Sequence, residues 1–190
     1  MKVLINEITA CTVCKPFLQE GPRPVFSVSP NCKILIIGQA PGQKVHDSGI
    51  PWNDPSGNEL RRWLGVDKEQ FYESEIFGLM PMGFCYPGKG KNGDLAPRPE
   101  CAPLWHQKLL ANMPQVKLTL LIGQYAQKYY LGKRVKASLT ETVMHYQDFL
   151  PEFFPLVHPS PRNRFWQKAN PWFELEVIPQ LRIITRSALK

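Results

Sequence analysis

Four of the five cysteines have a spacing that could hold a metal centre. Cys11 and Cys14 form a Cys-x2-Cys pair, and Cys85 and Cys101 lie far along the chain on either side of one loop. Four thiolates suit tetrahedral zinc or an iron–sulfur cluster. The Cys-x2-Cys pattern does not recur, which argues against a zinc ribbon, and free core cysteines with one chance pair stay open as the alternative. Cys32 precedes an apolar run and is interpreted as a buried thiol.

The sequence HPSPRN at residues 158–163 is the second candidate site. His158 leaves an apolar run directly into two prolines, which stiffen the loop and fix the direction of the side chain. Ser160 can bind backbone or phosphate, and Arg162 and Arg164 add positive charge. The loop therefore suits an anionic substrate, with a purely structural histidine in a proline-rich turn as the alternative.

A third candidate is the segment around Trp52. Pro51 and Pro55 bracket Trp52, Asn53 and Asp54, so that one aromatic face and two polar groups are presented together. Stacking of a nucleic-acid base on such a ring contributes about 1–3 kcal/mol. The alternative interpretation is a core tryptophan beneath a loop.

A fourth segment, GQAPG at residues 38–42, follows a buried apolar run at a place where α/β enzymes usually carry their chemistry. It has one amide, Gln39, and neither an acid, a base nor a nucleophile. The segment also lacks the G-x-G-x-x-G spacing and the lysine of a phosphate-binding loop, which disfavours a nucleotide-binding enzyme.

The length, charge and apolar content of the chain limit the kinds of protein that it can be. The 190 residues suit a single domain spanning residues 1–190. The net charge of +7 favours nucleic acid as a partner, although mild basicity without a specific partner is an equal alternative. No apolar run approaches the ~20 residues that span a bilayer, and the N-terminus lacks a signal-peptide pattern, so we expect no membrane partner and a cytoplasmic protein. We expect a monomer, although the sequence carries no specific signal for oligomeric state.

Apolar runs alternate with helical patterns along the chain. Strands are predicted at residues 33–38, 75–84, 116–123 and 153–157, and helices at 56–66 with Ser56 as the cap, 100–113, 124–132 and 165–185, the last restarting near Pro171. A short first helix is expected to carry the Cys-x2-Cys pair. Such alternation predicts a parallel sheet covered on both faces, with ligands beyond the carboxyl ends of the strands.

Taken together, GQAPG, HPSPRN and the four-cysteine pattern resemble the uracil-DNA glycosylase superfamily, and most closely its iron–sulfur branch, over nearly the whole chain. The resemblance implies a three-layer α/β/α fold with a central, mostly parallel four-stranded sheet. It implies hydrolysis of the N-glycosidic bond of a deaminated base, uracil first, in DNA. A DNA-binding or damage-sensing homologue that has lost catalysis is the alternative.

The resemblance also implies roles for individual residues. Cys11, Cys14, Cys85 and Cys101 would bind a [4Fe-4S] cluster, with zinc as the less favoured metal, and would shape the loop 86–100. His158 would stabilise negative charge at the base O2, helped by backbone N–H groups of Gln39 and Ala40, while Trp52, Asn53 and Gly38 would contact the base. Ser160, Arg162, Arg164, Lys89 and Lys91 would contact DNA, with Arg162 or Phe165 as a wedge.

Four positions depart from the iron–sulfur branch or its relatives. Ala40 stands where several other branches carry a water-positioning Asp or Asn, although the iron–sulfur branch shares this alanine. Gln39 replaces a glutamate, Trp52 replaces a phenylalanine, and Pro81 stands where that branch has a base-reading asparagine. Asn53 or Asp54 is the candidate replacement for that reader. The excised base and the residue that positions water are therefore left open.

Overall fold

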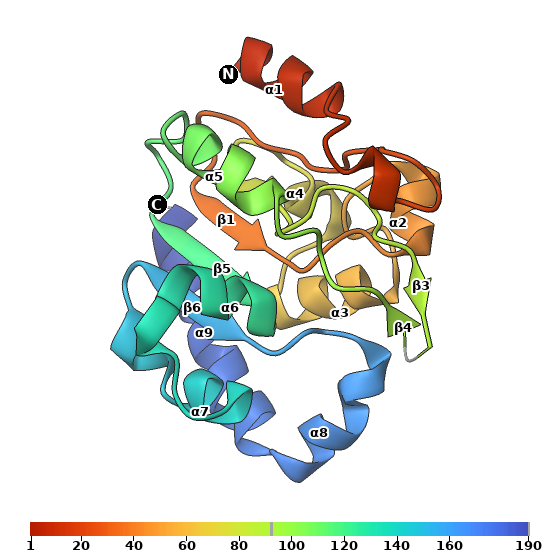
Figure 1. Cartoon of the computed structure of the whole chain (residues 1–190). Helices are drawn as coiled ribbons and strands as arrows, with labels where there is room; N and C mark the ends of the chain where they lie inside the picture. Colours follow the sequence, from red (N-terminus) through yellow and green to blue (C-terminus); the bar gives the residue numbers. More distant parts are fainter. Residues whose placement is uncertain (92, 190) are drawn as a thin grey trace.

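Four parallel strands form the central sheet of the computed structural model, which describes residues 1–91 and 93–189 (Figure 1). The strands are β1 (Ile34–Ile37), β2 (Phe77–Leu79), β5 (Leu118–Ile122) and β6 (Phe153–Leu156). Their order is β2-β1-β5-β6, and each neighbouring pair is parallel. All four predicted strands are confirmed, although each is shorter than its apolar run.

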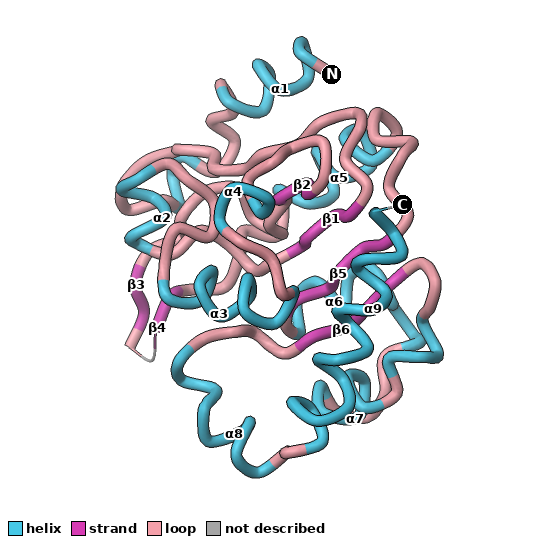
Figure 2. The backbone as a smooth tube through the Cα atoms, turned by 180° about the vertical axis from the view of Figure 1, so that it is seen from behind, coloured by secondary structure: helices cyan, strands magenta, loops and turns pink. Residues whose placement is uncertain are grey.

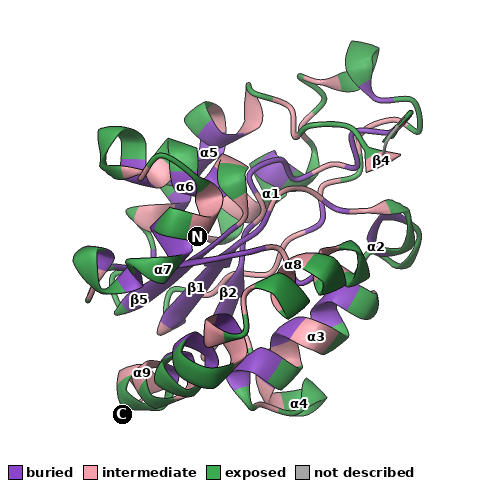
Figure 3. Ribbon diagram, turned by 90° about the horizontal axis from the view of Figure 1, so that it is seen from below, coloured by how far each residue is buried: buried purple, intermediate pink, exposed green. Residues whose placement is uncertain are grey.

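Alternation of side chains along β1 explains why this sheet is covered on both faces. Ile34 and Ile36 belong to one hydrophobic cluster, whereas Leu35 and Ile37 belong to the other, and all four are fully buried. A strand that is apolar at every position is stable only with helices on both sides. Figure 3 shows the buried strands between helices whose outer faces are exposed.

Two helical layers supply this cover (Figures 1 and 2). On the face of Ile34 and Ile36 lie α3 (Pro55–Leu64), α4 (Lys68–Phe71), α7 (Leu139–Met144) and α9 (Ile178–Leu189). The other face packs against α1 (Lys2–Thr9), α5 (Cys101–Leu110) and α6 (Gln124–Leu131). The arrangement is the predicted three-layer α/β/α fold.

Three shorter elements lie near the carboxyl ends of the strands. Helix α2 (Gln43–Ser48) follows the GQAPG turn, and α8 (Arg164–Ala169) follows the HPSPRN loop. An antiparallel hairpin of β3 (Lys89–Gly90) and β4 (Gly93–Asp94) lies in the segment expected to be a plain loop. The sequence patterns did not predict the hairpin, α2, α4 or α7, all of which are short.

Helix α3 begins differently from the prediction. Its cap is Asp54, whose carboxylate accepts a hydrogen bond from the Gly57 N–H at 2.8 Å, and Ser56 lies buried inside the first turn. Pro55 explains the difference, because proline is favoured at the first helical position and places the cap one residue before it. The helix ends at Gly65, as predicted, in the left-handed conformation.

Of the two predictions for the ends of the chain, the one for the first helix is wrong and the one for the last helical region is confirmed. Helix α1 ends at Thr9, so Cys11 and Cys14 lie in the turn that follows it rather than on the helix. Near Pro171 the last helical region restarts as predicted, because α8 ends at Ala169 and a π-helical segment (Phe173–Val177) leads into α9. Among the described residues, none of the helices is long and apolar enough to cross a bilayer.

Candidate active site

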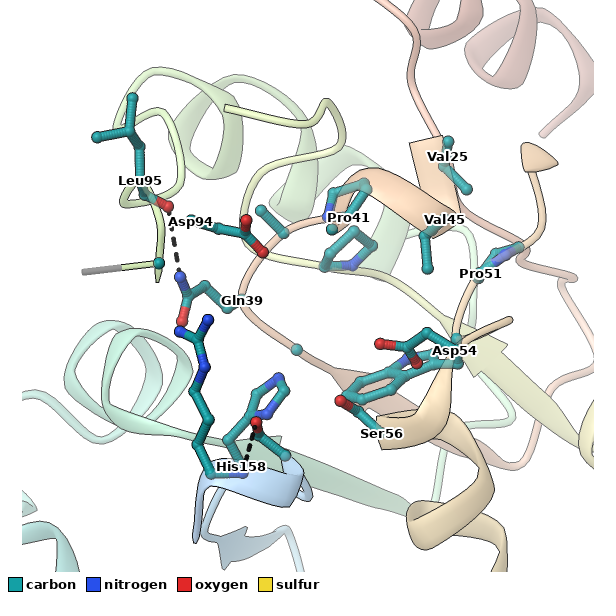
Figure 4. Close-up of a pocket in the computed structure, with 18 of the residues that line it drawn as sticks. Val25, Gln39, Pro41, Val45, Pro51, Asp54, Ser56, Asp94, Leu95 and His158 are labelled. Atoms are coloured by element: carbon teal, nitrogen blue, oxygen red, sulfur yellow. Dashed lines mark hydrogen bonds between the residues drawn. The ribbon is translucent and has the colours of Figure 1, made fainter. Parts of the chain in front are cut away.

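A cavity of about 440 Å³ opens beyond the carboxyl ends of β1 and β6 (Figure 4). Its walls come from the GQAPG turn after β1, the loop before α3, the β3–β4 hairpin and the HPSPRN loop after β6. These are the places at which a parallel sheet is expected to bind its ligand. Segments more than 100 residues apart in the sequence therefore meet in one site.

Most of the predicted pocket residues line this cavity. They are Gly38, Gln39, Ala40, Trp52, His158, Ser160 and Arg162. Asn53 does not contribute to the described lining, so its expected contact with the base has no support from the cavity. Arg164, Lys89 and Lys91 also lie outside the lining, but all three are exposed near it, as a contact to the DNA backbone requires.

The Trp52 indole forms one side of the cavity. It stacks on the His158 imidazole with ring centroids 5.8 Å apart and an interplanar angle of 28°. Trp52 adopts φ 57°, and it is the sole residue other than glycine with a positive φ in the described part of the chain. This strained conformation is typical of functional sites, where the surrounding structure must enforce it.

Two glycines make room for Trp52. A Cβ atom on Gly38 would lie 2.7 Å from the indole Cζ2, and one on Gly57 would lie 1.8 Å from the Trp52 carbonyl oxygen. The Tyr72 hydroxyl donates a 2.9 Å hydrogen bond to the Pro51 carbonyl oxygen just before the turn. The indole is thereby fixed as a wall of the cavity, rather than packed wholly within the core.

His158 is held at the base of the cavity by its own loop. The Asn163 side-chain amide donates a 2.7 Å hydrogen bond to the His158 carbonyl oxygen, and the Arg162 N–H donates to the Ser160 hydroxyl oxygen at 3.3 Å. Burial lowers the pKa of His158 below its usual range, although the negative charges of Asp54 and Asp94 act in the opposite direction. The imidazole is consequently neutral at pH 7, with one N–H to donate.

Some backbone groups of the GQAPG turn form hydrogen bonds within the protein, and others do not. The carbonyl oxygens of Gly38 and Gln39 accept hydrogen bonds from Met82 and Gly83 at 2.9 and 3.0 Å. Within residues 1–91 and 93–189, no acceptor pairs with the N–H groups of Gln39 or Ala40. Two backbone donors at the cavity wall are therefore available to a ligand.

Pro81, which stands where the resembled branch has an asparagine, also lines the cavity. Its carbonyl oxygen lies 3.1 Å from the Nε2 atom of the buried His106, whose Nδ1 atom lies 2.7 Å from the Tyr130 hydroxyl. Because a carbonyl only accepts, Nε2 carries the hydrogen and Nδ1 accepts from Tyr130. A buried network thus supports the wall behind Pro81.

Among the residues that line the cavity and were not assigned to it from the sequence, Asp94 and Asn163 have polar side chains. Sequence reasoning named Asp54 only as a substitute base reader, whereas this residue both caps α3 and lines the cavity. The Asp-Pro-x-Gly pattern around Pro55 is a signal for the cap. Asp94 has no such signal, because its position depends on a hairpin that reaches the cavity from a distant part of the chain.

The four candidate metal ligands gather at a second place. Cys11, Cys14, Cys85 and Cys101 line one small, mostly apolar cavity of about 20 Å³. Burial raises the pKa of the Cys14 thiol, that of Cys85 to about 11 and that of Cys101 to about 12. These thiols stay protonated at pH 7 unless a cation stabilises their thiolates. Cys32 lies elsewhere in the core, where it is fully buried as interpreted.

The four sulfur atoms do not form a ready single-ion site. In the described part of the chain, no three His, Cys, Asp or Glu side chains converge closely enough to hold a metal ion. Thiolates on one zinc ion lie about 4 Å from each other, because each Zn–S bond is about 2.3 Å long. The zinc alternative therefore has no support in the described part of the chain.

Comparison with known proteins gives two findings. The sequence model described as Uracil DNA glycosylase superfamily matches residues 26–182, which include the whole sheet and every residue that lines the large cavity except Val25. A protein named Type-4 uracil-DNA glycosylase from Sulfurisphaera tokodaii is 22% identical over 166 residues, covering 82% of this chain and 72% of that protein.

Proposed function

The chain belongs to the uracil DNA glycosylase superfamily, and from this membership we propose that it is a DNA glycosylase that hydrolyses the N-glycosidic bond of a deaminated base. Uracil is the first candidate base, because the relative from Sulfurisphaera tokodaii is named for that activity. The observation that carries the proposal is the stacking of Trp52 on His158 in one cavity at the carboxyl ends of the strands. DNA is then the partner, and base excision repair the process.

The cavity provides the groups that departure of a base requires. A glycosylase takes its target base out of the duplex, and an aromatic face such as that of Trp52 holds the extruded base by stacking. The bond can break with its electron pair passing to the base, so the protein must stabilise an anion. The neutral His158 would donate its N–H to the base oxygen, and the free N–H groups of Gln39 and Ala40 would add to this stabilisation.

Exposed, positively charged side chains lie on two of the segments that form the cavity walls. Arg162 and Arg164 follow His158, and Lys89 and Lys91 lie in or beside the β3–β4 hairpin. Contacts from such side chains to phosphates fix the register of a protein on DNA and do not read sequence. Ser160 would add a hydroxyl to this set, and the 84% exposed Phe165 is the proposed wedge in the duplex.

We further propose that the four cysteines hold a [4Fe-4S] cluster. The support is that four cysteines, two of them in a Cys-x2-Cys pair, line one small cavity, and four thiolates are the ligand set of an iron–sulfur cluster. The cluster would supply thiolate–iron bonds as a structural brace. Cys85 and Cys101 flank the segment that contains the hairpin, so the chain around the cavity mouth would be tied to the end of α1.

The activity is tested with oligonucleotides that contain uracil, hypoxanthine or xanthine at one position. Strand scission after alkali treatment is expected with wild-type protein and is expected to fall sharply in His158→Ala. Lys108→Ala, a change on the exposed face of α5, is the control that should retain activity. No scission on any of the three substrates would instead favour a DNA-binding homologue without catalysis.

The cluster has an independent test. Anaerobically purified protein is expected to be brown, with about four irons per chain, and Cys85→Ser should lose both colour and iron. Cys32→Ser, at a cysteine outside the cavity, is the matched control. A colourless protein that contains one zinc ion would overturn this assignment. A monomeric state and a cytoplasmic location stay predictions.

A further inference from the structure

We propose that Asp94 is the general base that positions and deprotonates the hydrolytic water. The inference rests on the proposed glycosylase function and deepens it. Ala40 leaves the GQAPG turn without a carboxylate, and the Gln39 amide, which also lines the cavity, cannot accept a proton from water, so a carboxylate from another segment is the candidate for this role. Asp94, at the end of β4, lines the cavity beside that turn (Figure 4).

The position of the Asp94 carboxylate is fixed by close neighbours. A Cβ atom on Gly42 would lie 3.3 Å from Asp94 Oδ2, so the carboxylate lies directly against the GQAPG turn. On its other oxygen, Oδ1, Asp94 accepts a 3.4 Å hydrogen bond from the Tyr86 hydroxyl. Tyr86 is 2% exposed, and its ring lies 5.8 Å from the buried ring of His46. A buried support thus aims an acidic group at the cavity.

The structure gives Asp94 no competing structural task. None of the described residues forms an ion pair with it, and its hydrogen bond from Tyr86 is long. A carboxylate without a salt bridge retains lone pairs with which to accept a proton from water. Asp94 and His158 line the same cavity.

Asp54 is the other carboxylate in the cavity, and it is less suited to this role. One of its oxygens already accepts the Gly57 N–H at 2.8 Å as the cap of α3. Figure 4 shows Asp54 and Asp94 on different sides of the cavity. Asp54 adjoins Trp52, which is the proposed base wall, whereas Asp94 adjoins the turn on which other branches carry their water-positioning residue.

The chemistry balances with water as the sole co-reactant. The bond between the base nitrogen and C1′ breaks, and its electron pair remains on the base, whose negative charge His158 stabilises. The water oxygen forms a bond to C1′ of the electron-poor sugar while one water proton passes to Asp94. That proton then returns through solvent to the base anion, which leaves a neutral base and an abasic sugar.

The test measures chemistry and binding separately. Single-turnover excision of uracil is followed with enzyme in excess, and binding is followed by fluorescence anisotropy with an oligonucleotide that carries 2′-fluoro-deoxyuridine, which resists cleavage. Asp94→Asn is expected to slow excision by about 100- to 10,000-fold, the usual loss for a general base. The dissociation constant of the Asp94→Asn protein for the 2′-fluoro oligonucleotide should stay within about twofold of the wild-type value, because only the proton acceptor is lost.

Three further variants separate catalysis from structure. Asp47→Asn makes the same change of charge on the nearby helix α2, outside the cavity, and should leave the rate unchanged. Tyr86→Phe removes the hydroxyl that supports Asp94 and should give a smaller loss than Asp94→Asn. Sodium formate should accelerate Asp94→Ala but not wild type, because a small carboxylate can occupy the vacated space; a purely structural role would give no such rescue.

The outcomes distinguish this inference from the proposed function. An active wild type with Asp94→Asn within about threefold of its rate would overturn the role of Asp94 and leave the glycosylase proposal standing. A large loss in Asp54→Asn without a loss in Asp94→Asn would assign the water to Asp54 instead. An inactive wild type with its iron bound would overturn both.

Discussion

His106 is the buried histidine that we expect to contribute most to acid unfolding. It belongs to α5 and is fully buried against the wall behind Pro81, and burial lowers its pKa to about 4 despite the hydrogen bond to the Pro81 carbonyl. The experiment lowers the pH from 7 to 4.5 and compares the free energy of unfolding at the two values. In this window the unfolded chain protonates the histidine while the folded protein holds it neutral.

The magnitude follows from the two pKa values. A histidine in an unfolded chain titrates near 6.5, so the contribution of His106 is fully present above that pH and is lost progressively as the pH falls toward 4. Integrating proton binding from pH 7 to 4.5 for a folded pKa of about 4 gives a loss of about 2.5 kcal/mol in the free energy of unfolding. That is a large share of the 5–15 kcal/mol typical of a domain.

The assay is urea unfolding followed by tryptophan fluorescence at both pH values. The reference is His106→Gln, whose side-chain amide can donate to Pro81 and accept from Tyr130 without titrating. The wild type should lose about 2.5 kcal/mol more than the variant between pH 7 and 4.5. Contributions from His158 and from any bound cluster cancel in this difference. Equal losses in the two proteins would show that the folded protein does not hold His106 neutral.

Substitutions at three positions around Trp52 have distinct expected outcomes. Gly57→Ala should destabilise the protein by about 1–3 kcal/mol or abolish folding, since the new Cβ meets the Trp52 carbonyl at 1.8 Å; an unchanged melting temperature would contradict this. The Gly38→Ala protein should fold, but the new methyl group should displace the Trp52 indole. Quenching of tryptophan fluorescence by DNA should therefore change, and excision should be slower. Affinity for undamaged DNA should not change. Asp54→Ala should cost about 1 kcal/mol of stability through loss of the helix cap, with Asp54→Asn close to wild type in chemical denaturation.

The sequence contained enough to locate the sheet and most of the cavity. Continuous apolar runs mark strands buried on both faces, and a parallel sheet brings their carboxyl ends together. Gly38, Ala40 and His158 could therefore be placed in one site although 120 residues separate the first from the last. The aromatic residue of the cavity was also recognisable, because prolines bracket Trp52.

The remaining features of the fold and of the cavity depend on interactions that no local sequence pattern encodes. Asp94 reaches the cavity because a two-residue-strand hairpin folds back toward the GQAPG turn, and strands this short carry no periodic signal. The cap of α3 could have been read from Asp54 followed by Pro55, but Ser56 offered an equally good capping side chain. The four-residue helix α4 is likewise below the length at which periodicity can be detected.

The fit of Trp52 between two glycines has a consequence for how this site can change. The indole fills the space above Gly38, so a side chain at position 38 must displace the indole. The Trp52 carbonyl fills the space above Gly57, so a side chain at position 57 is excluded while the turn keeps its left-handed backbone. A smaller ring at position 52 would relieve the first restriction but not the second, which the backbone imposes. The three positions therefore form an epistatic set, in which the aromatic residue can vary first and the glycine at position 57 last. In any laboratory evolution of substrate range, diversity introduced at position 52 should be tolerated before diversity at position 38, and the order of mutations should matter.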